Sequence, residues 1–91
     1  MELERLIKSI KEHNESIDNY INVTLAKELN AVNGEIRLDQ WFKAQQLIKK
    51  QGFYEKAIAI LEPARNAGYD VKINMQSYKL VLYGKRGNGN E

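Results

Sequence analysis

The chain has one histidine, His13, and its surroundings do not make a catalytic site. On a helix, the positions three and four residues away hold two serines and two isoleucines, so no carboxylate there could orient the imidazole or share a metal ion. A histidine within such an apolar row is usually a packed core residue. We therefore expect no catalytic, cofactor-binding or metal-binding role at this position.

The other groups that could do chemistry are dispersed. Cysteine is absent, which excludes disulfides, thiolate zinc sites and thiol nucleophiles. The three serines have no evident base, and the carboxylates are not paired as acid–base catalysis requires. The glycines at positions 84, 87 and 89 do not precede a helix, so they do not form a phosphate-binding loop. We predict a protein that is not an enzyme, with no cofactor and no small-molecule substrate.

Composition and charge describe the class of protein and its partner. A hydrophobic content of 43% with one proline is typical of a globular domain. There is no apolar run of the ~20 residues that a bilayer requires, and the N-terminus does not resemble a signal peptide. We expect a cytoplasmic protein of bacterial or mobile-element origin, without membrane contact. The net charge is −2 over residues 1–34 but +6 over residues 40–86, which favours an anionic partner for the C-terminal part.

Apolar residues repeat with heptad spacing in the N-terminal segment, residues 1–33. One interpretation is an amphipathic helix that packs on its own domain; the other is a helix pair that forms a homodimer. Weak helix formers at 14–18 predict a break, followed by a second helix over 19–31 that ends at Asn33 and Gly34. The candidate dimerisation residues are Leu3, Leu6, Ile10, His13, Ile17 and Tyr20.

An amphipathic pattern predicts the next helix over residues 39–50, with Asp39 as N-cap. The alternating stretch 35–38 precedes it as an extended bridge or a brief strand. The expected apolar side of this helix holds Leu38, Trp41, Phe42, Ala44, Leu47 and Ile48. Its two aromatic residues are therefore expected in the core rather than stacked on nucleobases.

A further helix is predicted over residues 53–67, after Gly52, and Pro63 should kink it or split it. Residues 70–83 alternate apolar and polar side chains, which predicts two strands joined around residues 75–77. The turn lacks an Asn-Gly or Asp-Gly pair, so one long strand is the alternative. Residues 84–91 are expected to form a flexible tail.

Together these elements predict a mostly helical α+β fold: an N-terminal helix or helix pair, two further helices and a C-terminal β-hairpin. The order over residues 34–83 resembles that of winged helix-turn-helix domains. The stretch ILEPARNAGYDV at 60–71, followed by Tyr-Lys-Leu at 78–80, is similar to the end of a recognition helix that enters a wing. This resemblance implies a winged-helix-like domain that binds DNA, with helix 53–67 in the recognition position and the hairpin lysines near the phosphate backbone.

The charge of the helix at 53–67 departs from that expectation. Its outward face carries Glu55 and Glu62, which a phosphate-lined groove repels. We therefore expect DNA contacts from the lysines of helix 39–50 and of the hairpin, in a small DNA-binding regulator or accessory protein. The alternative is a protein-interaction module, such as a phage or plasmid protein that binds and inhibits a host protein. The candidate contact residues are Lys43, Lys50, Lys56, Lys72, Lys79, Tyr83, Lys85 and Arg86.

Overall fold

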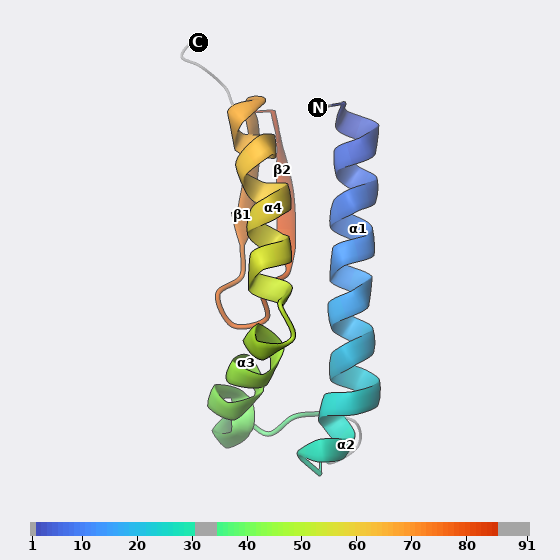
Figure 1. Cartoon of the computed structure of the whole chain (residues 1–91), viewed down its shortest axis with the longest axis vertical. Coiled ribbons are helices and arrows are strands. Elements are labelled where there is room, and N and C mark those ends of the chain that lie inside the picture. Colours follow the sequence, from blue (N-terminus) through green and yellow to red (C-terminus); the bar gives the residue numbers. More distant parts are fainter. Residues whose placement is uncertain (1, 31–34, 86–91) are drawn as a thin grey trace.

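A long N-terminal helix lies along a unit of two helices and a hairpin in the computed structural model, which describes residues 2–30 and 35–85 (Figure 1). The first helical stretch consists of α1 (Leu3–Asn19), a π-helical turn (Tyr20–Leu25) and the short α2 (Ala26–Glu28). A 3-10 turn (Leu38–Gln40) leads into α3 (Trp41–Lys50), and α4 (Phe53–Asn66) follows. The chain then forms an antiparallel pair, β1 (Tyr69–Ile73) and β2 (Leu80–Lys85). The fold is α+β and mostly helical, as predicted.

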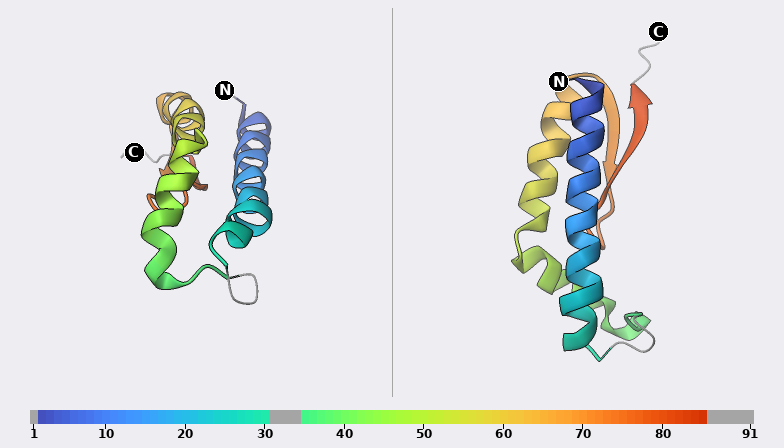
Figure 2. Two further views of the ribbon diagram at one scale, coloured as in Figure 1. Left: turned by 60° about the horizontal axis from the view of Figure 1, so that its bottom comes forward. Right: turned by 90° about the vertical axis from the view of Figure 1, so that its right-hand side faces the viewer.

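The hairpin has one covered face and one open face. Residues that pair directly across two strands share a face of the sheet, and Ile73 pairs with Leu80 while Lys72 pairs with Val81. Leu80 is buried against α1 and α4, which lie side by side over this face (Figure 2). Val81 is 46% exposed. The face that carries Lys72 and Val81 is therefore the open one.

The heptad seam of α1 contributes to the core of its own chain. Leu6 and Ile10 pack with α4 and the hairpin, and Ile17 packs with α3 and the start of α4. His13 is also buried, whereas Leu3 is 45% exposed. A dimer through this seam would have to open the core, so the structure favours the interpretation in which the helix packs on its own domain.

The break predicted at residues 14–18 is wrong, because α1 is continuous through Asn19. Asparagine and aspartate weaken helices when their side chains bind the local backbone. Here the side chain of Asn14 binds the backbone of Leu80, and the carboxylate of Asp18 pairs with Lys79. The irregular segment comes one turn later, in the π-helical turn, whose side chains Tyr20 and Ile21 face the core.

The start of α3 differs from the prediction in two ways. Asp39 makes no capping hydrogen bond and pairs instead with Arg37, with Nε and Oδ1 3.3 Å apart. Leu38 and Phe42, expected in the core, are 87% and 73% exposed. Ala44 and Ile48 alone are fully buried among the residues of this helix, since α3 contacts the core along a narrow stripe.

The second half of the fold is close to expectation. Gly52 has a φ of +86° and links α3 to α4 in a left-handed conformation that glycine adopts without strain. Pro63 does not split α4, which is continuous to Asn66. Residues 70–83 form a hairpin rather than one long strand, and β2 extends to Lys85, beyond the predicted start of the tail. The predicted helix end at residues 33–34 and the tail after residue 85 lie outside the described residues.

Candidate nucleic-acid interface

The solvent face of α3 is basic along its whole length. At 100° per residue, the exposed side chains of α3 lie within an arc of about 120°. None of the residues from Trp41 to Lys50 is acidic, and Lys49 and Lys50 occupy the last turn, where the helix dipole favours cations. This surface, called the α3 face below, consists of Phe42, Lys43, Gln46, Lys49 and Lys50.

The α3 face is continuous with the hairpin loop, residues 74–79. Gln45, one turn beyond Phe42, donates from Nε2 to the carbonyl oxygen of Met75 at 2.6 Å. The Nζ of Lys49 lies 5.6 Å from the centroid of the Tyr54 ring, and that ring packs edge-on against Tyr78 with centroids 5.4 Å apart. The loop and the α3 face are therefore held together by packed side chains.

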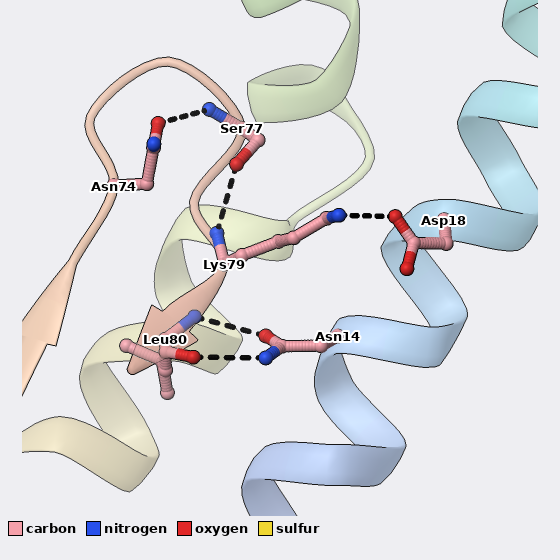
Figure 3. A network of polar contacts seen from close by, with 6 residues as sticks. All are labelled: Asn14, Asp18, Asn74, Ser77, Lys79 and Leu80. Atoms are coloured by element: carbon pink, nitrogen blue, oxygen red, sulfur yellow. Dashed lines mark hydrogen bonds and ion pairs between the residues drawn. The ribbon is translucent and has the colours of Figure 1, made fainter. Parts of the chain in front are cut away.

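The loop is ordered by bonds of its own (Figure 3). The Oδ1 of Asn74 accepts hydrogen bonds from the backbone N–H groups of Gln76 and Ser77, at 2.8 and 3.0 Å. Ser77 Oγ accepts from the backbone N–H of Lys79. Tyr78 has a φ of +64°, a conformation that costs energy for a bulky residue and that its surroundings must impose.

Helix α1 imposes that conformation from the other side. The Nε2 of His13 is 2.8 Å from the carbonyl oxygen of Tyr78, so it must donate to that oxygen. Asn14 pairs with both backbone groups of Leu80, donating to its oxygen at 2.8 Å and accepting from its N–H at 2.9 Å (Figure 3). This amide occupies the position of a neighbouring strand and closes the outer edge of β2. Asp18 pairs with Lys79, which is therefore already neutralised.

The open face of the hairpin presents an aromatic ring beside a lysine. The strand register shifts between Asp70 and Val71, and Tyr83 is the extra residue. Its side chain is 65% exposed, and the Nζ of Lys72 lies 5.4 Å from its ring centroid. A shallow hollow of about 270 Å³ lies beside this pair. Its lining residues are Lys72, Ile73, Asn74, Val81 and Tyr83.

A separate groove of about 380 Å³ runs between α1 and α4. Its walls carry Glu12 and Lys56, and the Nζ of Lys56 lies 5.5 Å from the centroid of the buried Phe53 ring. The mixed charges of this groove do not suit a polyanion. Lys56, a predicted contact residue, therefore lies in this groove and not on the basic surface of α3 and the hairpin.

Four of the eight predicted contact residues lie on the two exposed surfaces described above. Lys43 and Lys50 lie on the α3 face, and Lys72 and Tyr83 lie together on the open hairpin face. Lys79 turns toward α1, and Lys85 is exposed at the end of β2, opposite Tyr69. Arg86 lies outside the described residues.

The prediction for the α3 face is wrong at Phe42, which was expected on the apolar side of the helix because it flanks the apolar face on the helical wheel. Gln46 and Lys49 were not among the candidate contact residues. The signal that could have found this face is the absence of acidic residues from Trp41 to Lys50 together with three lysines. This charge pattern can be read from the sequence without knowing how much of the helix the core covers.

Residues 2–30 and 35–85 hold no group of three or more His, Cys, Asp or Glu side chains arranged for a metal ion. Among the same residues, no helix is long and apolar enough to cross a membrane.

Comparison of the chain with protein-family models, with curated proteins and with solved structures gave no match.

Proposed function

We propose that this protein is a non-enzymatic DNA-binding regulator or accessory factor that contacts nucleic acid through the α3 face and the adjoining hairpin. The observation that carries the proposal is the composition of the α3 face: three exposed lysines, a glutamine and an exposed phenylalanine, with no acidic side chain. Lysine supplies phosphate contacts, and a glutamine amide can hydrogen-bond to the edge of a base. The proposal moves the contact from α4, where the resemblance to winged-helix domains puts it, to α3.

The charges on the two helices favour α3. Glu55 and Glu62 are exposed on α4. Of the two basic residues on this helix, Lys56 lies in the groove with Glu12, and Arg65 donates from Nε to the carbonyl oxygen of Val71. Phosphates would be repelled from that face and attracted to the face of α3. Gln45 joins α3 to the hairpin loop. Lys72 adds a further positive charge on the open face of that hairpin, beside Tyr83.

Salt dependence of binding tests the proposal. Four lysines are available to phosphates: Lys43, Lys49, Lys50 and Lys72. Each neutralised phosphate contributes about 0.9 to the slope of log K against log salt for duplex DNA and about 0.7 for a single strand. Four contacts predict that affinity falls about 50- to 150-fold between 50 and 200 mM salt. Fluorescence anisotropy with labelled 20-mers, single-stranded and duplex, measures this; no binding to either form at 50 mM salt would refute the proposal.

A charge-reversal pair separates the α3 face from general electrostatics. The double variant Lys43→Glu/Lys50→Glu should lose at least about tenfold in affinity, because it removes two phosphate contacts and adds repulsion. Lys8→Glu/Lys11→Glu is the matched control, since both lysines are exposed on α1 and the change in net charge is the same. Equal losses in the two double variants would contradict a contact at α3.

A second candidate is a protein-interaction module that binds and inhibits a host protein. The observation in its favour is the exposure of Leu38 (87%) next to Phe42 (73%), since adjoining exposed apolar side chains mark protein contacts. This candidate would be favoured if one host protein co-purified with the chain in stoichiometric amount and no longer did so with the Leu38→Asp variant. The chain should then also have no affinity for oligonucleotides.

A further inference from the structure

We propose that the ligand of this surface is single-stranded nucleic acid, whose unpaired bases stack on Phe42 and Tyr83. The inference rests on the proposed function and deepens it, because it states which form of nucleic acid the surface takes. Phe42 and Tyr83 are 73% and 65% exposed; Lys72 lies beside the Tyr83 ring, and Lys43 follows Phe42 in the sequence. Base–aromatic stacking with a basic track for the backbone is how proteins bind single strands without reading sequence.

Strand alternation puts the Tyr83 ring on the open face of the hairpin. Tyr83 comes two residues after Val81 on β2, and its side chain lines the hollow of about 270 Å³ together with Lys72, Asn74 and Val81. The Nζ of Lys72, 5.4 Å from the ring centroid, shows that a face of the ring is accessible to a cation from solvent. A base that stacks there displaces the ammonium group toward its own phosphate, so the pair supplies one stacking site and one charge contact.

Phe42 provides the second stacking site on the same path. In Figure 2 (right), α3 begins on the side of the molecule where the hairpin lies and ends beneath α4. From the level of Tyr83, the path runs down four residues of β1 and the loop to Met75, crosses to Gln45 and reaches Phe42 one helical turn away. At ~3.3 Å per strand residue and ~5.4 Å per helical turn, the hairpin and α3 parts of this path sum to roughly 20 Å, and the Gln45 side chain and its hydrogen bond add the crossing between them. A short oligonucleotide therefore spans both rings.

Duplex DNA fits this surface less well. A double helix buries the faces of its bases, so it offers no partner for two exposed rings unless base steps are unstacked at a cost of a few kcal/mol per step. The helix that follows the turn, α4, presents Glu55 and Glu62 instead of groove-reading side chains. The open hairpin face offers Lys72 beside the half-buried Asp70, which is too little charge to follow two phosphate backbones.

The test compares one fluorescein-labelled 15-mer, alone and annealed to its complement, by anisotropy at 50 mM salt. The single strand should bind at least about tenfold more tightly than the duplex. Phe42→Ala and Tyr83→Ala should each weaken single-strand binding by about 5- to 150-fold, the range for loss of one stacked base. Phe42→Trp and Tyr83→Phe keep an aromatic ring and should retain affinity. Ile7→Ala is the control, because Ile7 is a half-exposed apolar residue on α1.

The outcomes separate the inference from the proposed function. Duplex binding as tight as single-strand binding, or alanine variants with unchanged affinity, would overturn the inference while DNA binding stands. No binding to either oligonucleotide would overturn both. Far-UV circular dichroism and the melting temperature of each variant check that it folds, which both exposed positions should allow.

Discussion

Removing the side-chain amide of Asn14 should destabilise the whole fold, because that amide fastens α1 to the hairpin. It makes two part-buried hydrogen bonds with the backbone N–H and carbonyl oxygen of Leu80. A hydrogen bond contributes about 0.5–1.5 kcal/mol net, so the loss of two costs about 1–3 kcal/mol. Alanine returns roughly 0.5 kcal/mol through its higher helix propensity. Asn14→Ala should therefore lower the free energy of unfolding by about 0.5–2.5 kcal/mol.

The size of that loss is measurable by urea unfolding followed by circular dichroism at 222 nm. In a domain of this size it corresponds to a fall in melting temperature of about 2–20 °C. Asn14→Asp should cost at least as much, because one carboxylate oxygen would then face the Leu80 carbonyl. Asn19→Ala is the matched control, an exposed asparagine at the end of the same helix. Equal effects of Asn14→Ala and Asn19→Ala would refute the role given to this amide.

Two other predictions follow from burial along the same helix. Burial raises the pKa of Tyr20, and the carboxylate of Glu28 adds to the rise while Gln51 opposes it. The neutral phenol is thus favoured in the folded state, and stability should decline as pH rises above about 10, the pKa of tyrosine in unfolded chains. Tyr20→Phe should show a smaller decline in urea unfolding between pH 8 and pH 10.5; an unchanged decline would contradict this. Leu6 is fully buried in the core of its own chain, so Leu6→Ala should cost about 2–5 kcal/mol without changing the molar mass in light scattering. A halved mass would instead indicate that the seam joins two chains.

The sequence predicted most of the fold because its elements follow local rules. Gly52 and Gly68 mark the ends of α3 and α4, and the change to period two after residue 69 marks the hairpin. The prediction failed where a distant partner changes the local preference. Asn14 and Asp18 read as helix breakers, but their partners on the hairpin are more than 60 residues away in sequence.

The candidate site was only partly predictable for a related reason. Lysine side chains are rarely buried, so Lys43, Lys50 and Lys72 could be assigned to the surface from the sequence alone. The exposure of Phe42 could not be assigned in this way, because a helical wheel gives direction but not how wide a stripe the core covers. The ion pair of Lys79 with Asp18 and the bulge at Tyr83 depend on tertiary packing and strand register, which no local pattern encodes.

The most direct test of the central claim is a map of the binding surface by NMR. Backbone amide shifts of the ¹⁵N-labelled chain would be followed during titration with an unlabelled 15-mer single strand at 50 mM salt. The account predicts that the shifts concentrate on Phe42–Lys50, on the hairpin loop and on the strand residues beside Lys72 and Tyr83. Shifts concentrated on the outward face of α4 or in the groove between α1 and α4, or no shifts at all, would contradict it.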